Sequence, residues 1–168
     1  MHIFIVGPMA SGKSTIGKIL AKTLRVDFID TDKEIEKKAG VDISWIFEIE
    51  GEKGFRERER GILKEITKKK DLVISTGGGI VLLEENRKLM STKGKIIYLE
   101  TSIQVQLNRT INDKIRPLLG KGNKREILKA LKEERDPLYH EIADVTINQK
   151  EKKSGQILSE IINELNIK

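Results

Sequence analysis

The fold class of this chain is indicated by one stretch near its N-terminus, Gly7-Pro8-Met9-Ala10-Ser11-Gly12-Lys13-Ser14-Thr15. The stretch has the pattern G-x-x-x-x-G-K-[ST], follows an apolar run at residues 3–6, and precedes apolar residues at helical spacing over about 13–24. A strand, a glycine loop and a helix in this order form a phosphate-binding loop. The sequence therefore predicts that the chain binds the phosphates of a nucleoside triphosphate.

The residues of this loop have separate expected tasks. Gly7 and Gly12 permit backbone conformations that other residues resist, so that successive N–H groups can face anionic oxygens. Lys13 is expected to reach the β- and γ-phosphates, and Ser14 to ligate Mg²⁺ through its hydroxyl. The positive N-terminal end of the following helix adds to this attraction. We expect the nucleotide to contact the loop residues Pro8, Met9, Ala10, Ser11, Gly12, Lys13, Ser14 and Thr15.

The rest of the chain alternates short apolar runs with helical patterns, which predicts an α/β fold with a parallel sheet covered on both faces. Ligands of such sheets gather at the carboxyl ends of the strands. The chain has 168 residues, which suits one domain. The expected strands are about 2–6, 26–29, 72–75, 95–99 and 145–147, and the expected helices about 13–24, 33–39, 43–50, 52–69, 84–91, 103–112, 123–135 and 154–166.

The composition narrows the possible classes of protein. The chain has no cysteine, so disulfides and thiolate metal sites are excluded. No apolar run approaches the ~20 residues that span a bilayer, and no secretory signal is evident, so we expect a cytoplasmic protein without a membrane partner. The net charge is +6, but basic residues alternate with acidic ones and aromatic residues make up only 4%. We therefore expect no nucleic-acid partner.

Two carboxylates follow the second expected strand. Asp30 and Asp32 are expected close to the phosphate loop in this topology. They are the candidate carboxylates for Mg²⁺, because the third strand, where many proteins with this loop have that carboxylate, ends in Ser75-Thr76 without an acid. Either aspartate could instead serve a turn or a helix cap, and Asp32 could cap a helix that begins at Lys33. Both interpretations stay open at this point.

Glycines and arginines complete the set of candidates. The triple glycine at residues 77–79 follows a buried strand and permits close approach of a bound molecule to the backbone. Arg116 lies in a loop followed by glycines. Three further arginines, Arg56, Arg109 and Arg135, fall on expected helices, where a solvated role is the alternative.

Together these residues resemble shikimate kinase. The resemblance covers nearly the whole chain: the phosphate loop, Asp30-Thr31-Asp32, Gly51-Glu52 with Phe55-Arg56 and Glu59, the triple glycine, Arg109-Thr110, Arg116-Pro117-Leu118-Leu119, and Arg135 with Pro137-Leu138-Tyr139. It implies a P-loop kinase fold of three layers with a five-stranded parallel sheet in the order 2-3-1-4-5. It also implies transfer of the γ-phosphoryl group of ATP to the 3-hydroxyl of shikimate, in the route to chorismate and the aromatic amino acids.

The resemblance also implies a role for each matched residue. The catalytic residues would be Lys13, Asp32 and Arg116, with Asp32 bound to the hydroxyls of shikimate and Arg116 closing onto the phosphates. The carboxylate of shikimate would be held by Arg56 and Arg135, and its ring would lie along Gly77, Gly78 and Gly79. The adenine would be flanked by Arg109, and Mg²⁺ would be held by Ser14 and, through water, by Asp30.

The same resemblance divides the chain into working parts and shows one departure. A substrate-binding region would span about 31–59 and a lid about 111–123, within one domain over 1–168. We expect a monomer whose partners are the small molecules ATP and shikimate. The family often has glycine where this chain has Ala10, and alanine resists a positive φ, so the fine geometry of the loop is in question. Residues 152–155, beside the adenine, match only loosely.

Two other functions are alternatives for a chain with a phosphate loop. A gluconate or nucleoside monophosphate kinase has the same kind of fold, but a nucleobase acceptor calls for aromatic or amide groups where this chain offers Asp32, Arg56 and glycines. A nucleotide-dependent switch or a nucleic-acid-binding ATPase is the second alternative. A GTP-type switch needs an Asn-Lys-x-Asp motif, which Asn123-Lys124-Arg125-Glu126 does not supply.

Overall fold

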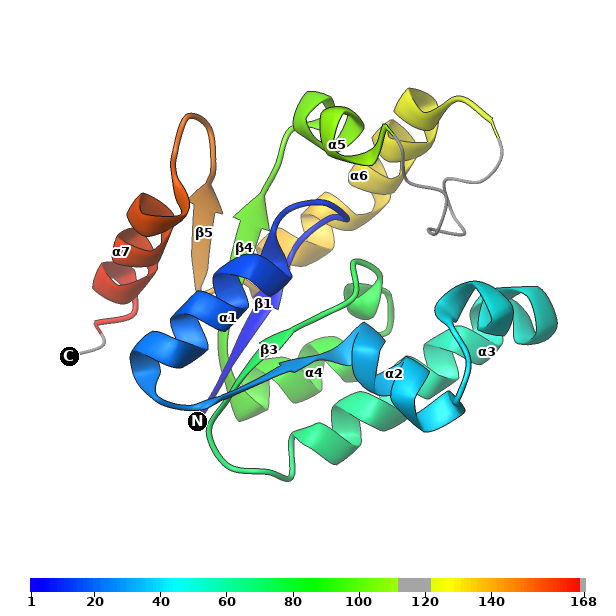
Figure 1. Cartoon of the computed structure of the whole chain (residues 1–168), viewed down its shortest axis with the longest axis horizontal. Coiled ribbons are helices and arrows are strands. Elements are labelled where there is room, and N and C mark those ends of the chain that lie inside the picture. Colours follow the sequence, from blue (N-terminus) through cyan, green and yellow to red (C-terminus); the bar gives the residue numbers. More distant parts are fainter. Residues whose placement is uncertain (112–121, 167–168) are drawn as a thin grey trace.

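The computed structural model of the chain describes residues 1–111 and 122–166. Its centre is a parallel five-stranded sheet with helices on both faces (Figure 1). The order of the strands is β2-β3-β1-β4-β5, which confirms the order that the resemblance implies. The strands are β1 (His2–Val6), β2 (Asp27–Asp30), β3 (Leu72–Ser75), β4 (Gly94–Glu100) and β5 (Val145–Asn148).

The helices cover the sheet in two groups. In chain order they are α1 (Lys13–Leu24), α2 (Thr31–Ala39), α3 (Ile43–Ile66), the short 3-10 helix η1 (Ile80–Leu82), α4 (Glu84–Lys93), α5 (Ile103–Thr110), α6 (Lys124–Ile142) and α7 (Ser154–Glu164). One apolar cluster joins the sheet to α1 and α7, and a second joins it to α3, α4 and α6. Within the described residues, no helix is both long enough and apolar enough to cross a membrane.

The buried strand β1 shows why two clusters form. Successive side chains of a strand point to opposite faces, so Ile3 and Ile5 pack in the cluster of α1 and α7, while Phe4 and Val6 pack in the cluster of α3, α4 and α6. All five residues of β1 are buried. A strand buried on both faces reads as a continuous apolar run rather than an alternating one, as the N-terminal sequence does.

The structure corrects the expected start of the second helix. The helix α2 begins at Thr31, not at Lys33, and its N-cap is Asp30, whose side chain accepts hydrogen bonds from the backbone N–H groups of Asp32 and Lys33. The interpretation of Asp32 as a helix cap is therefore wrong. The caps of helices prefer a side chain that reaches the second or third N–H of the helix, and here Asp30 does so.

Two further helix limits differ from expectation. The helical conformation is interrupted at Gly51, with φ 70° and ψ −178°, which confirms the break expected there, and α3 ends at Ile66 rather than at residue 69. The helix α6 runs to Ile142 rather than to residue 135, although Pro137 lies inside it. Tyr139 is 1% exposed and stacks on Tyr98 of β4. Burial of that ring favours continued helix despite the hydrogen bond that proline removes.

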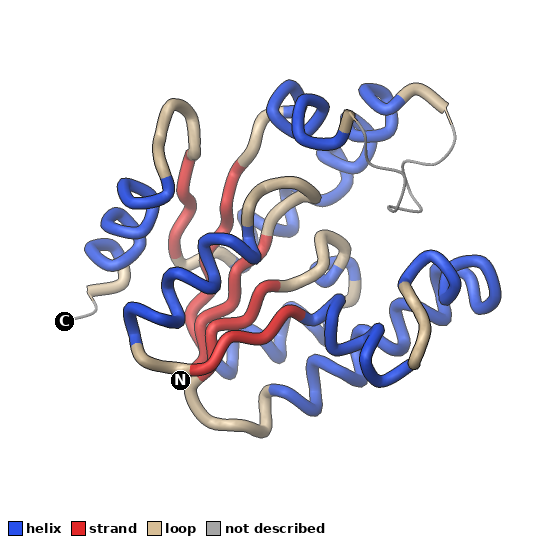
Figure 2. The backbone as a smooth tube through the Cα atoms, viewed as in Figure 1, coloured by secondary structure: helices blue, strands red, loops and turns tan. Residues whose placement is uncertain are grey.

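The parallel register brings distant parts of the sequence to one edge of the sheet (Figure 2). Ser75 is paired with Asp30 on one side and with Ile5 on the other. Glu100 is paired with Asn148. The loops that follow β1, β2, β3, β4 and β5 therefore start together, as expected for ligand sites of such sheets.

Candidate active site

A cavity of about 720 Å³ opens at this edge. In Figure 1 the loop between β1 and α1 lies between α5 and α6 on one side and α2 and α3 on the other. Most of the expected site residues line the cavity: Met9, Ala10, Ser11, Gly12, Lys13, Ser14, Thr15, Asp30, Asp32, Arg56, Gly77, Gly78, Gly79, Arg109 and Arg135. Pro8 is in the same loop but does not line the cavity. Arg116 lies outside the described residues.

The phosphate loop is held in a tight turn. Gly7 has φ 148°, and a Cβ atom there would lie 2.7 Å from the carbonyl oxygen of Leu99, so only glycine fits. Gly12 has φ 84°. The ammonium group of Lys13 donates to the carbonyl oxygen of Pro8 at 2.8 Å and to Oγ of Ser11 at 3.4 Å. Lys13 is thus positioned over the loop itself.

Ala10 adopts a conformation that favours glycine. Its φ is 60°, in the left-handed region, where a residue other than glycine costs roughly 1–2 kcal/mol. Alanine takes the strained conformation, and neighbouring contacts hold it there.

Ser14 and Asp30 form an oxygen-rich corner of the cavity. The hydroxyl of Ser14 donates to Oδ2 of Asp30 at 2.6 Å and lies 3.3 Å from Oγ of Ser75. The other oxygen of Asp30, Oδ1, caps α2. The capping bonds fix the carboxylate so that Oδ2 faces Ser14. A hydroxyl and a carboxylate are the ligands that Mg²⁺ prefers, so this corner fits that ion.

Two buried carboxylates meet at Gly77. A Cβ atom on Gly77 would lie 2.8 Å from Oδ1 of Asp32 and 2.8 Å from Oε2 of Glu59. Neither oxygen has a hydrogen-bond partner among the residues that the structure describes. Burial and the nearby Asp30 raise the pKa of Asp32 to about 6, against the lowering effect of Lys13 and Arg56. Burial raises the pKa of Glu59 to about 7, with Arg56 opposing and Asp32 adding to the shift.

Arg56 lies against the backbone of the triple glycine. Its guanidinium donates to Glu59 at 3.0 Å and to Glu52 at 3.2 Å. A Cβ atom on Gly79 would lie 2.3–2.4 Å from three atoms of that guanidinium. Only a glycine allows Arg56 to lie here, which gives the third glycine of the run a physical reason.

Arg135, on α6, lines the cavity beside the same glycine run. It is 5% exposed, and its Nη1 lies 3.5 Å from the position of a Cβ atom on Gly78. The hydroxyl of Tyr139 donates to the carbonyl oxygen of Gly78 at 2.5 Å. Two buried guanidinium groups, Arg56 and Arg135, therefore face the glycine run. Planar guanidinium groups suit a carboxylate, which accepts two parallel hydrogen bonds.

The sequence alone assigns no role to two residues of the site, Glu59 and Gln149. Glu59 accepts a hydrogen bond from Arg56. Its position three residues after Arg56 on the same helix could have predicted this ion pair. Gln149 follows β5 and lines the cavity, and no local pattern distinguishes it from other polar residues.

The two carboxylates predict a pH dependence of stability. Both native pKa values are raised, so between about pH 5 and 7 the folded chain retains protons that the unfolded chain has lost. The free energy of unfolding should therefore fall as pH rises through this window, by up to ~1.4 kcal/mol per pH unit and proton. Urea unfolding of the ligand-free protein at pH 5.0 to 8.0 measures this. Glu59→Gln should flatten the slope, and an equal slope in that variant would contradict the assignment.

Fold and site together define a P-loop kinase that acts on small molecules. The family model for shikimate kinase matches residues 9–166. A shikimate kinase of Actinobacillus pleuropneumoniae is 52% identical over 96% of this chain and 93% of its own length. One of Vibrio parahaemolyticus is 48% identical over 98% and 95%. The solved structure of a shikimate kinase from Acinetobacter baumannii in complex with shikimate has a TM-score of 0.95 and 44% identity, and the match covers 98% of this chain and 92% of that one. This chain belongs to the shikimate kinase family.

Proposed function

We propose that this chain transfers the γ-phosphoryl group of ATP to the 3-hydroxyl of shikimate, forming shikimate 3-phosphate and ADP. The observation that carries the proposal is the cavity that holds the phosphate loop at one side and Asp32, Arg56 and Arg135 at the other. A triphosphate and a small hydroxy acid bound to these two groups would meet beside Lys13 and Asp32. The family membership and the shikimate complex of the Acinetobacter baumannii relative support this choice of acceptor.

On the nucleotide side, the phosphate loop and Lys13 would hold the β- and γ-phosphates. Ser14 and Asp30 would hold Mg²⁺, which when bound neutralises charge on the transferring phosphoryl group. Arg109 projects to the loop, where its Nη1 donates to the carbonyl oxygen of Ala10 at 2.7 Å. We place it beside the adenine.

On the acceptor side, Arg56 and Arg135 would bind the carboxylate, and the backbone of residues 77–79 would line the ring. Asp32 would orient the accepting hydroxyl and receive its proton as the phosphoryl group arrives. A base with a pKa near 6 is suited to this task at neutral pH. Phosphoryl transfer needs mainly positioning and positive potential, which this arrangement supplies.

We further propose that the chain works as one domain and as a monomer, with a substrate-binding region at about 31–59. The proposed lid at about 111–123 falls mostly outside the described residues, and so does Arg116. The role of Arg116, closing onto the phosphates, is carried by the sequence alone. Closure would exclude water and suppress ATP hydrolysis.

A coupled assay of ADP release tests the proposal. Turnover is expected with ATP, Mg²⁺ and shikimate, and not when Mg²⁺ is withheld. Gluconate and nucleoside monophosphates serve as competing acceptors. Faster ADP release with either of these than with shikimate would reject shikimate as the substrate.

Gly79→Ala should weaken binding of the acceptor while leaving binding of ATP nearly unchanged. The added Cβ would overlap the guanidinium of Arg56 and displace it, because the arginine is the more flexible partner. Loss of a charge-assisted hydrogen bond should raise the KM for shikimate about 10- to 100-fold, with little change in the KM for ATP. Steady-state kinetics measures both constants.

Gly61→Ala is the matched control for this change. Gly61 lies in α3, and nothing lies within 4 Å of a Cβ atom there. The control should keep normal kinetics. An unchanged KM for shikimate in Gly79→Ala would show that Arg56 does not bind the acceptor from this position.

A further inference from the structure

Four successive carbonyl oxygens of the phosphate loop are each bonded by a side chain. The carbonyl of Pro8 accepts from Lys13 at 2.8 Å, that of Met9 from Nε2 of Gln106 at 3.1 Å, that of Ala10 from Nη1 of Arg109 at 2.7 Å, and that of Ser11 from Nε2 of Gln149 at 2.8 Å. The donors come from α1, from α5 and from the residue after β5. Helices and strands far apart in the sequence thus converge on one loop.

These bonds determine where the N–H groups of the loop point. In a planar trans peptide the C=O and the N–H point in opposite directions, and the chain has no cis peptide among its described residues. When one of these donors holds a carbonyl oxygen, the N–H group of the next residue must point the other way. The N–H groups of Met9, Ala10, Ser11 and Gly12 are therefore oriented as a set. These four residues line the cavity, where anionic oxygens would lie.

Gln149 has three acceptors within hydrogen-bond distance. Its Nε2 atom also donates to Oγ1 of Thr101 at 2.8 Å and to the carbonyl oxygen of Glu100 at 3.3 Å. One amide group thereby ties the ends of β4 and β5 to the loop. It follows β5 directly, so the sheet fixes its place.

Gln106 bonds the loop from α5. It is 2% exposed, and its neutral amide can bond a carbonyl in a buried place without the desolvation penalty of a charge. The bond that it makes to Met9 adjoins the one that Arg109 makes to Ala10, the left-handed residue. The two bonds secure the strained part of the loop from α5.

We propose that Gln106 and Gln149 are positioning residues that hold the phosphate loop in its nucleotide-binding conformation before the nucleotide arrives. The proposal rests on the proposed function, since it concerns the ATP site of that reaction. Neither residue needs to touch the nucleotide, because each acts through a loop carbonyl. A preformed loop binds more tightly, since it pays no ordering entropy on binding.

The test measures nucleotide binding directly. Isothermal titration of the full chain with ADP and Mg²⁺ gives the Kd, and steady-state kinetics gives the KM values for ATP and shikimate. In Gln149→Ala and in Gln106→Ala, the Kd for ADP and the KM for ATP are expected to rise about tenfold. The KM for shikimate should stay within about twofold, since the residues proposed to bind shikimate, Arg56, Arg135 and 77–79, are separate from these two glutamines.

Two further variants sharpen the result. Gln149→Glu keeps the size of the side chain and an acceptor oxygen but has no N–H donor, so it should bind ADP no better than Gln149→Ala. Gln104→Ala is the control, because Gln104 is an exposed glutamine of the same helix as Gln106 and bonds only Asn108 and Arg125 among the described residues. It should bind ADP normally.

The outcomes distinguish this inference from the proposed function. If the unaltered chain does not bind ADP, the proposed function fails and this inference with it. If the unaltered chain binds ADP and folded Gln149→Ala and Gln106→Ala bind it equally well, only the inference fails. Equal rises in both KM values would mean that the two glutamines support the whole fold rather than the loop, which also overturns it. Should Gln149→Ala not fold, Gln106→Ala decides the question from a different element.

Discussion

Asp32→Asn is expected to lower kcat about 10³-fold, within the range for loss of a positioned proton acceptor. The substitution keeps the shape of the side chain and removes its charge and basicity. Asp32 lines the same cavity as the phosphate loop, Arg56 and Arg135, and its Oδ1 has no hydrogen-bond partner in the described part of the chain. That oxygen is buried beside Gly77 with its hydrogen-bonding capacity unused, while the residue lines the cavity in which the acceptor would bind. An amide there could orient the hydroxyl but could not take its proton.

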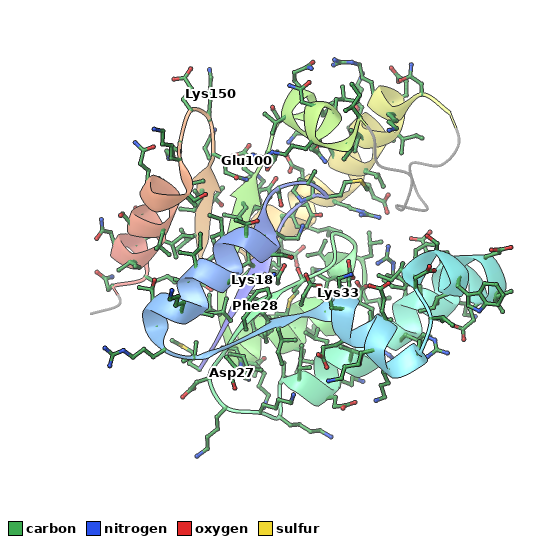
Figure 3. All side chains as sticks on the ribbon, in the orientation of Figure 1. Lys18, Asp27, Phe28, Lys33, Glu100 and Lys150 are labelled. Carbon is green, nitrogen blue, oxygen red and sulfur yellow. The ribbon has the colours of Figure 1, made fainter. Side chains whose placement is uncertain are left out.

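The measurement is steady-state kinetics with saturating ATP and shikimate. Asp27→Asn is the control, since Asp27 begins β2 and is exposed, far along the strand from the carboxyl edge (Figure 3). The control should turn over normally. Turnover within tenfold of the unaltered protein in Asp32→Asn would remove Asp32 from the reaction centre.

Lys13→Met should lower kcat/KM for ATP by about 10²–10³-fold, the usual effect of losing one group that stabilises charge in a transition state. The methionine fills similar space but carries no charge. The ammonium group of Lys13 is held at the loop by Pro8 and Ser11, so it is in place before the phosphates arrive. Its positive potential also reaches Asp32, whose pKa it lowers against the effect of burial.

The same change at Lys18 tests whether any loss of charge on α1 would suffice. Lys18 is five residues further along the helix, is exposed, and lies 6.0 Å from the ring of Phe28 (Figure 3). Lys18→Met should leave kcat/KM for ATP unchanged. An equal loss in both variants would mean that the net charge of the helix, and not the position of Lys13, governs the rate.

Much of the architecture could be predicted from local patterns. The apolar run at residues 3–6, the glycine loop and the helical spacing that follows are all short-range features, and they fix a strand, a turn and a helix wherever they occur. The break at Gly51 was predictable for the same reason. Helix limits were less so, because Pro137 signals an end that the burial of Tyr139 overrides.

Local pattern alone did not separate the roles of the two aspartates, which came only from the resemblance to shikimate kinase. Asp30 and Asp32 are both acids after the same strand, and each could be a cap or a ligand from its position alone. The register of β2 against β3 places Asp30 beside Ser14 and Ser75. The cap on α2 then turns its second oxygen toward Ser14, and Asp32 is left to face Gly77.

The sequence alone determines a phosphate loop and an alternating order of strands and helices, since each of these depends on neighbours within a few positions. The family resemblance also follows from the sequence, because its short motifs occur in order along the chain. Which side chains share a cavity depends on tertiary packing. Arg56 meets Gly79, Tyr139 meets Gly78, and Gln149 meets Ser11, across separations of 23, 61 and 138 residues. Such contacts arise only when parallel strands bring their carboxyl ends to one edge, because no local pattern encodes the distance between residues so far apart.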